Sequence, residues 1–342
     1  MNIPYGRQDV NEDDIDAVTQ VLKSDYLTQG SVVPKFEQSV VSHTGAEYAV
    51  AVNSATSALH LACMALNVMP GDYVWTSPIT FVASANCALY CRATIDFVDI
   101  DPISYNMSVT ALSKKLELAK KTNTLPKVLI PVHLAGQSCE MKAIHSLSIK
   151  YGFKIIEDAS HAIGAKYLDK PVGNCLYSDI SVFSFHPVKI VTSVEGGMAV
   201  TNNPELANIM QRLRSHGITR DPTEMIGSPD GSWYYQQLHL GFNYRMSDVH
   251  AALGLNQMKR LKEFIVKRNV IASYYDEILQ DLPIKTPSQN LDCYSSFHLY
   301  VIRIPENDRN FNRRQVFERL RSNGIGANVH YIPIYRQPYF KK

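Results

Sequence analysis

The sequence predicts an α/β protein with a mostly parallel sheet and a second, smaller domain. Short runs of apolar and β-branched residues alternate with helical patterns along most of the chain. This is the order of elements in a parallel sheet with crossover helices. A long helical pattern at 249–279 then leads into the last part of the chain, which would form the second domain. With 342 residues, 45% of them hydrophobic, the chain can bury a core large enough for two domains.

The charge and the cysteines limit the class of protein. A net charge of +2 without a basic run gives no reason to expect binding to nucleic acid or to a membrane surface. The six cysteines form no CxxC motif and the eleven histidines form no HExxH, so we expect no metal site. The first residues lack the apolar core of a signal peptide, and no stretch approaches a membrane span. We therefore expect a cytoplasmic protein with reduced thiols.

The first elements begin at clear helix starts. Residues 1–11 are expected to form an extended arm, and Asn11 with three acidic residues after it indicates a helix. A polar loop at 24–31 precedes a second helix from Pro34. Buried strands, rich in β-branched and aromatic residues, are expected at 48–52, 73–76, 94–98, 128–132, 154–156, 180–185 and 198–201. Helices are expected after residue 59 and at 81–90, 140–151 and 205–214.

The last part of the chain is expected to form the smaller domain. A polar segment at 215–241 has the length and composition of a surface excursion or a subunit contact. A helix at 249–279, capped by Ser247 or Asp248, is expected to cross into the small domain. Further elements are expected as a strand at 297–304, a helix at 313–322 and a strand at 326–330. The predicted boundaries are 1–250 for the large domain with its arm and 251–342 for the small α/β domain.

A single lysine lies on the loop between two of the expected strands. Lys189 follows Pro187, which has no N–H to give to a ladder, and Gly196-Gly197 makes the turn into the next strand. A lysine desolvated there would lose affinity for its proton and become an amine nucleophile. The alternative is a solvated loop lysine, as most lysines are.

Two further features lie at strand ends, where α/β proteins bind ligands. The stretch NSATSAL (53–59) joins a strand to a helix, and a helix start built from small residues offers free N–H groups to a phosphate. An ordinary Ser/Thr cap is the alternative. Asp158 ends another strand, where its carboxylate either caps the next turn or pairs with a cationic ligand atom.

The lysine, the aspartate and the helix start together match the needs of one cofactor. Pyridoxal 5′-phosphate has an aldehyde, a ring nitrogen that must stay protonated, and a phosphate. A lysine can form a Schiff base with the aldehyde, and a carboxylate can keep the ring nitrogen protonated. We therefore predict a site for pyridoxal 5′-phosphate that contains Lys189 and Asp158.

Several stretches resemble one family along nearly the whole chain. They are NSATSAL (53–59), SPITFVASAN (77–86), EDASHAIGA (157–165), SDISVFSFHPVK (178–189), EGGMAVTN (195–202), RSHG (214–217) and GFNYRMSDVHAALGLNQ (241–257). On these stretches the chain resembles the DegT/DnrJ/EryC1/StrS sugar aminotransferases. This implies the type I, aspartate aminotransferase-like fold with a mostly parallel seven-stranded sheet. Tyr5, DYLTQG (25–30) and VHYIPIY (329–335) make it most similar to the branch of pseudaminic acid synthesis.

The resemblance implies a role for each cofactor contact. Lys189 would hold the cofactor and act as general base and acid, and Asp158 would pair with the ring nitrogen. His161 would lie beside the phenolic oxygen, and Phe81 would stack on the ring; a core or capping histidine and a core phenylalanine are the alternatives. The other implied contacts are the N–H groups of Ala55 and Thr56, the Ser184 hydroxyl, and Asn243 of a second subunit. A homodimer with shared active sites follows from the last of these.

The resemblance also implies the substrates. L-glutamate would donate its amino group and leave as 2-oxoglutarate. The acceptor would be carbon 4 of the UDP-linked 4-keto sugar UDP-2-acetamido-2,6-dideoxy-β-L-arabino-hexos-4-ulose, on a route to pseudaminic acid for flagellin glycosylation. The implied sugar contacts are Tyr5, Asp25, Tyr26, Leu27, Thr28, Arg245, His330 and Tyr331. For Arg245 a structural role is the alternative.

Other functions stay open at this point. A 3-aminotransferase or another 4-aminotransferase, of the bacillosamine or perosamine type, would share every cofactor residue. A 3-dehydratase of the family has histidine where this chain has Lys189, and a non-catalytic paralogue is the interpretation outside enzymes. Family members continue beyond HYIPIY (330–335) with further helix and strand. The small domain is therefore expected to be naturally short, truncated or altered by a frameshift.

Overall fold

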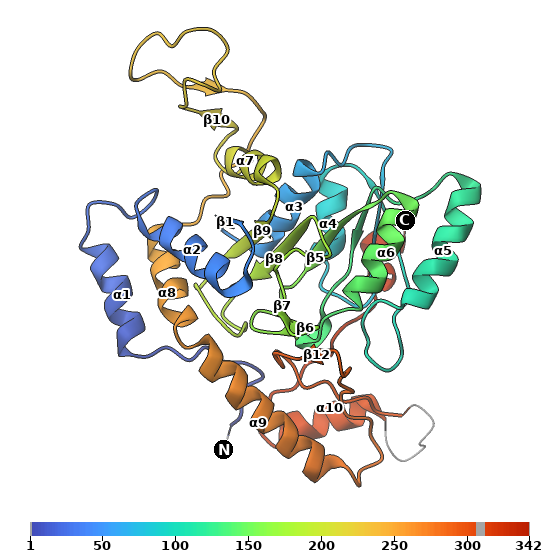
Figure 1. Cartoon of the computed structure of the whole chain (residues 1–342). Coiled ribbons are helices and arrows are strands. Elements are labelled where there is room, and N and C mark those ends of the chain that lie inside the picture. Colours follow the sequence, from blue (N-terminus) through green and yellow to red (C-terminus); the bar gives the residue numbers. More distant parts are fainter. Residues whose placement is uncertain (1, 306–311, 342) are drawn as a thin grey trace.

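A seven-stranded sheet lies at the centre of the computed structural model, which describes residues 2–305 and 312–341 (Figure 1). Its strands are β1 (Tyr48–Val52), β2 (Tyr73–Thr76), β3 (Thr94–Phe97), β4 (Val128–Ile130), β5 (Lys154–Asp158), β8 (Ile180–Ser184) and β9 (Gly197–Thr201). They lie in the order β1-β9-β8-β5-β4-β2-β3. All neighbours are parallel except the two pairs that β9 makes, with β1 and β8. The predicted mostly parallel sheet of seven strands is confirmed.

Helices cover both faces of this sheet, and the alternation of side chains explains how. Along β1, Val50 and Val52 belong to one apolar cluster, whereas Ala49 and Ala51 belong to another on the opposite face. The first cluster includes side chains of α3 (Ala55–Ala65), α4 (Ala83–Tyr90) and α7 (Pro204–Leu213). The second includes α2 (Val32–Thr44) and α8 (Asp248–Met258), and a third cluster includes α5 (Val109–Thr122) and α6 (Met141–Tyr151).

The predicted helix at 249–279 is wrong as a single element. It is divided into α8 and α9 (Leu261–Leu279), with Lys259 and Arg260 between them. The Arg260 guanidinium donates to the Asp9 carbonyl at 2.7 Å and to the Asp14 carboxylate at 2.6 Å. Asp14 lies in α1 (Glu12–Leu22), which begins with the predicted cap at Asn11. The arm and α1 therefore hold the chain where α8 ends, and α9 leaves the large domain (Figure 1).

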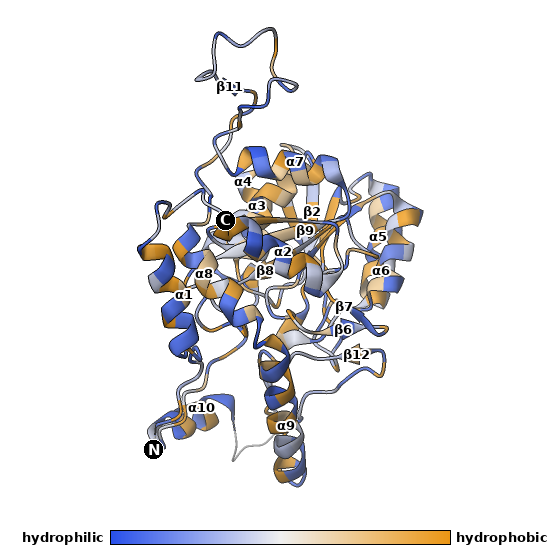
Figure 2. Ribbon diagram, turned by 60° about the vertical axis from the view of Figure 1, so that its left-hand side comes forward, coloured by the Kyte–Doolittle hydropathy of each residue, from blue (hydrophilic) through white to orange (hydrophobic). Residues whose placement is uncertain are grey.

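The polar segment 215–241 is a surface excursion, as predicted. Its only regular structure among the described residues is a short hairpin of β10 (Ile218–Thr219) with β11 (Gln236–Gln237). Figures 1 and 2 show this segment extending well beyond the sheet and its helices. It exposes large apolar side chains, since Ile226 is 82%, Trp233 75% and Leu240 80% exposed.

The last part of the chain contains fewer strands than predicted. The helix at 313–322 is confirmed as α10 (Arg313–Ser322), but the strands at 297–304 and 326–330 are wrong. Among the described residues, the first segment has a single bridge, between Arg303 and Lys285. Next to the second segment, Ile325 forms a single bridge with Ile3. The alternating apolar pattern is present, but no neighbouring strand completes a ladder. A small sheet of β6 (Lys166–Tyr167), β7 (Lys170–Pro171) and β12 (Cys293–Tyr294) lies nearby.

No helix within residues 2–305 and 312–341 combines the length and the apolar content needed to cross a membrane.

Candidate active site

Lys189 lies on the connection between β8 and β9, near the middle of the sheet. The two ends of this connection are tied together, because the Phe185 N–H donates to the Gly196 carbonyl at 2.9 Å. Burial lowers the pKa of Lys189 to about 8, and the nearby Asp158 carboxylate opposes this shift. An appreciable fraction of the amine is therefore neutral near neutral pH, as nucleophilic attack on an aldehyde requires.

Asp158 ends β5 as predicted and is held at both oxygens. Its Oδ2 accepts a hydrogen bond from the Ser84 hydroxyl at 2.6 Å, and its Oδ1 accepts one from the Ser160 hydroxyl at 2.6 Å. The Ser160 N–H also donates to Oδ1, at 3.2 Å, so the carboxylate caps the following turn as well. A buried carboxylate held by several hydrogen bonds is fixed in orientation and can pair with a cationic ring nitrogen.

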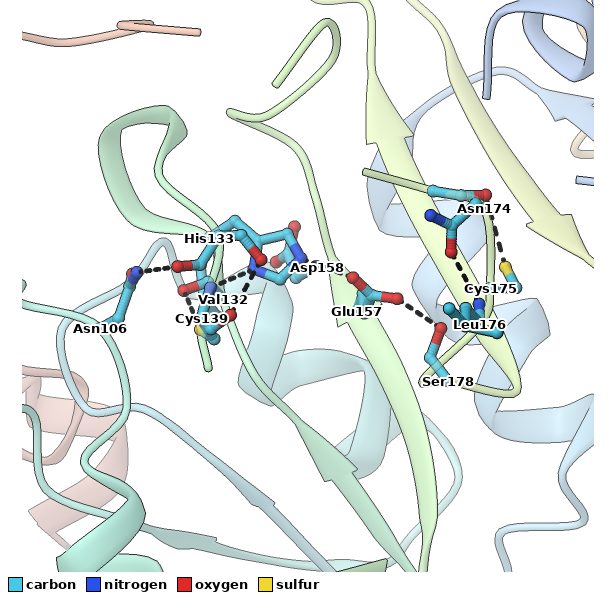
Figure 3. A network of polar contacts seen from close by, with 12 residues as sticks. Asn106, Val132, His133, Cys139, Glu157, Asp158, Asn174, Cys175, Leu176 and Ser178 are labelled. Atoms are coloured by element: carbon cyan, nitrogen blue, oxygen red, sulfur yellow. Dashed lines mark hydrogen bonds and ion pairs between the residues drawn. The ribbon is translucent and has the colours of Figure 1, made fainter. Parts of the chain in front are cut away.

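The backbone around Asp158 is fixed by its neighbours (Figure 3). The His133 N–H donates to the Asp158 carbonyl at 3.1 Å. The His133 side chain contacts the buried Glu157, with 2.7 Å between Nε2 and Oε2, and Glu157 also accepts from Ser178. The Cys139 N–H donates to Nδ1 of His133, which leaves Nε2–H to donate to Glu157. This network joins β4 and β5 immediately beside the candidate site.

Two histidine rings, those of His161 and His298, lie close enough to Lys189 to sense its charge. The Nδ1 atom of His161 accepts from the Ala135 N–H at 3.3 Å, and its Nε2 is 3.5 Å from the Tyr331 hydroxyl. The His298 ring lies beside it, with 4.4 Å between centroids. Burial first, and then the Lys189 charge, hold the pKa of His161 well below its usual range, so His161 is neutral.

The start of α3 has the properties of a phosphate site. Ser54 caps the helix by accepting from the Ser57 N–H at 3.2 Å. No acceptor for the N–H groups of Ala55 and Thr56 is found in the described part of the chain. A Cβ on Gly197 would come within 2.4 Å of the Ala55 nitrogen, so β9 can pass the helix start only as glycine. Both predicted alternatives are thus present, a serine cap and free N–H groups, and these residues fit a phosphate.

The predicted sugar contacts fall into two groups. In the first, the Tyr5 hydroxyl is 2.7 Å from Nε2 of His330, and the two rings stack with 5.4 Å between centroids. His330 packs on Tyr331, so the arm and residues 330–331 meet on the side of the site where His161 lies. Burial raises the pKa of Tyr5 to about 12 and lowers that of His330.

The second group lies at the start of α8. The Asp248 carboxylate accepts hydrogen bonds from the N–H groups of Gly30, Val32 and Val33, and its own N–H donates to the Leu27 carbonyl. These bonds fix the loop that carries Asp25 to Thr28, of which Tyr26 is 65% and Leu27 49% exposed.

The remaining predicted residues are partly or largely exposed, except Ser184. Arg245 donates to the Ser215 hydroxyl at 3.1 Å, which supports the structural alternative for it. Asn243 is exposed next to Tyr244, whose carbonyl accepts from the Asn53 N–H before α3. Phe81 is 59% exposed before α4, so it is not a core residue. Ser184, the last residue of β8, is buried.

Sequence reasoning missed three residues of this site. Ser84 and His298 contact the predicted residues only through the fold, because they lie far from Asp158 and His161 in the chain. Ser160 could have been predicted from the sequence, since a serine two residues after an aspartate often forms a local hydrogen bond with it.

Three features indicate the class of protein: a lysine whose pKa is lowered by burial, an aspartate at the end of β5, and a helix start whose first N–H groups have no acceptor among the described residues. It is a pyridoxal 5′-phosphate-dependent aminotransferase of fold type I. The chain belongs to the DegT/DnrJ/EryC1/StrS aminotransferase family, whose model matches residues 8–342.

Relatives and solved structures agree with this class. The chain is 40% identical to a UDP-4-amino-4,6-dideoxy-N-acetyl-beta-L-altrosamine transaminase of Campylobacter jejuni, over 99% of this chain and 86% of the relative. It is similar to the structure of Helicobacter pylori PseC, an aminotransferase of pseudaminic acid biosynthesis, with a TM-score of 0.90, 33% identity, and coverage of 100% and 88%. It is also similar to the pyridoxal phosphate form of the putative sugar aminotransferase Spr1654 of Streptococcus pneumoniae. The TM-score is 0.88 and the identity 29%, over 100% of this chain and 88% of that one.

Proposed function

We propose that this protein moves the amino group of L-glutamate to carbon 4 of a UDP-linked 4-keto-6-deoxy-N-acetyl hexose in pseudaminic acid biosynthesis. The specific acceptor is UDP-2-acetamido-2,6-dideoxy-β-L-arabino-hexos-4-ulose, on the route that serves flagellin glycosylation. The observation that carries the amino transfer is Lys189, whose pKa is lowered to about 8 beside Asp158. The likeness to the Campylobacter jejuni transaminase and to PseC supports this choice of sugar.

Lys189 moves protons in both half reactions. When bound, pyridoxal phosphate accepts the electron pair that is left after an α-proton is removed. The Lys189 amine takes this proton from glutamate and later returns one to carbon 4 of the sugar. The Asp158 carboxylate would hold the proton on the ring nitrogen, and hydrogen bonds from the hydroxyls of Ser84 and Ser160 orient that carboxylate.

The other cofactor contacts position the ring and its phosphate. The N–H groups of Ala55 and Thr56 and the Ser184 hydroxyl bind the phosphate, and Phe81 stacks on the ring. His161, neutral and fixed by Ala135, contacts the phenolic oxygen. Asn243 reaches the phosphate of a second subunit, so the active form is a homodimer in which two chains complete each site.

The nucleotide sugar is held from two sides. Tyr5, His330 and Tyr331 contact it from the arm side of the site. The exposed loop Asp25 to Thr28 and Arg245 contact the sugar bound to the second subunit. This arrangement agrees with the separation of the two groups within one chain.

A coupled assay tests this proposal. UDP-N-acetylglucosamine is converted by a 4,6-dehydratase that also inverts carbon 5, and this protein is added with glutamate. The expected product, by mass and NMR, is the L-altro sugar with an axial 4-amino group, and Lys189→Ala abolishes it. Product from the non-inverted D-sugar alone would instead assign a bacillosamine-type aminotransferase. Absence of both product and cofactor absorption would favour a non-catalytic paralogue.

A further inference from the structure

A cavity of about 390 Å³ opens beside Lys189, between the N-terminal arm and α9. Arm residues from Tyr5 to Asp9 form one side of it, and Lys189 and His298 lie on another. Apolar side chains of α9, among them Phe264, Ile271 and Ala272, line the rest. The cavity thus combines access to the reactive amine with a wall suited to methylene groups.

The guanidinium of Arg268 lines this cavity and forms no ion pair with a carboxylate of the described residues. Its Nη1 donates to the carbonyls of Phe297 at 3.0 Å and His298 at 3.2 Å. No carboxylate of residues 2–305 or 312–341 lies within ion-pair distance of it, and burial lowers its pKa. Of the other charged groups there, Lys267 pairs with Glu263 at 2.5 Å and Asp9 with Arg260 at 3.2 Å. Arg7 and Lys189 also line the cavity and make no ion pair among the described residues, so the cavity carries an excess of positive charge.

A buried histidine lines the same cavity. His298 is only 7% exposed, and its Nδ1 has no hydrogen-bond partner among the described residues. Burial first, and then the charges of Lys189 and Arg268, hold its pKa well below the usual range, so the ring is neutral. A partly buried guanidinium whose partners are neutral carbonyls, and a buried imidazole nitrogen with no partner among the described residues, both carry a free-energy cost that an anionic, hydrogen-bonding ligand would reduce.

We propose that this cavity binds the acidic amino donor, with Arg268 pairing with one of its carboxylates and His298 donating or accepting a second contact through Nδ1. The ligand class is a short dicarboxylate, such as glutamate or 2-oxoglutarate, whose methylene groups lie against α9. The inference rests on the proposed function, because it assigns the donor of that same site. A guanidinium suits this task, since its planar fork binds a carboxylate through two hydrogen bonds.

Glutarate tests this site without any reaction, because it has both carboxylates and no amino group. Its Kd is measured by calorimetry on the enzyme loaded with pyridoxal phosphate. We expect Arg268→Gln to raise this Kd about 10-fold or more, because a hydrogen-bonded ion pair is lost. Lys262→Gln removes the same charge from an exposed position of α9 outside the cavity and should leave the Kd unchanged. An unchanged Kd in Arg268→Gln overturns the assignment.

A measurement on the unaltered protein covers the case in which Arg268→Gln fails to fold. Phenylglyoxal modifies accessible arginines, and peptide mass spectrometry follows Arg268 with and without glutarate. Protection of Arg268 but not of Arg314 is expected, and equal rates with and without glutarate would contradict the proposal. Failure of the proposed function looks different, since the coupled assay would then give no amino sugar while glutarate binding and protection persisted.

Discussion

The Ser84 hydroxyl donates a 2.6 Å hydrogen bond to the Asp158 carboxylate from 74 residues away in the chain. Ser84 lies in α4, which packs on one face of the sheet, and Asp158 ends β5 in that sheet. The bond therefore sets the orientation of the carboxylate that we propose as the partner of the ring nitrogen. Thr80 extends the chain of contacts, with its hydroxyl 2.9 Å from that of Ser84.

Ser84→Ala should slow transamination without preventing cofactor binding. Loss of a hydrogen bond to a charged group is worth about 1.5–3 kcal/mol, so a fall in kcat of about 10-fold or more is expected. The measurement is single-turnover formation of 2-oxoglutarate from glutamate. Ser181→Ala is the matched control, because the Ser181 hydroxyl is buried in the same sheet and has no hydrogen-bond partner in the described part of the chain. Equal rates in the two variants would remove Ser84 from the site.

Attachment of the cofactor should depend on pH through Lys189. Its pKa is lowered from 10.5 to about 8, so the neutral amine becomes abundant as pH rises through about 8. The rate at which added pyridoxal phosphate forms its visible absorption band on the apoprotein should rise through that region and then level off. Stopped-flow absorbance between pH 6 and 10 measures it. A rate that still climbs steeply toward pH 10 would show an ordinary, solvated lysine.

Gly197→Ala should weaken binding of the phosphate. The new Cβ would lie 2.4 Å from the Ala55 nitrogen and from the Ser54 carbonyl carbon, so the start of α3 must shift. We expect the Kd of pyridoxal phosphate to rise about 10-fold or more, as measured by titration of the apoprotein. Gly6→Ala serves for comparison, because its Cβ would meet its nearest neighbour, Val188, at 3.6 Å. Wild-type affinity in Gly197→Ala would argue against a phosphate at α3.

Leu240→Asp should shift the proposed homodimer toward monomer, because the excursion at 215–241 exposes apolar side chains suited to contact with a second subunit. Leu240 is 80% exposed, and the nearby Ile226 and Trp233 are exposed as well, which is unusual for side chains that stay in water. Sedimentation velocity over a range of concentrations measures the change. Leu291→Asp, at a position 102% exposed outside this segment, should leave the dimer intact. Two variants with the same dissociation constant would refute a role for the excursion in assembly.

Local patterns predicted the sheet well and the last part of the chain poorly. The bounds of β1 and β2 agree with the prediction, because each is a short apolar run between polar residues. The segment 297–304 has a similar pattern, yet a strand needs a paired neighbour, and the described residues give this segment only the single bridge between Arg303 and Lys285. The break between α8 and α9 depends on the contact of Arg260 with Asp14. These residues lie far apart in the chain, so the local sequence does not predict the break.

The candidate site divides in the same way. Lys189, Asp158 and the start of α3 were predictable, because each lies directly at the end of a recognisable strand. His298 and Arg268 were not, because their importance comes from a cavity formed by segments that are distant in the chain. The α5 helix was also missed, and it covers the sheet away from these residues.

The antiparallel strand β9 has a consequence for motion. Because β9 returns directly beside β8, the connection that carries Lys189 is anchored at both ends in the interior of the sheet. Amide hydrogens of β8 and β9 should thus be among the slowest in the molecule to exchange with deuterium. The Lys189 amine would then move between the α-carbon of glutamate and carbon 4 of the sugar by rotation about its side-chain bonds, on a picosecond-to-nanosecond timescale. The backbone of Lys189 would stay still.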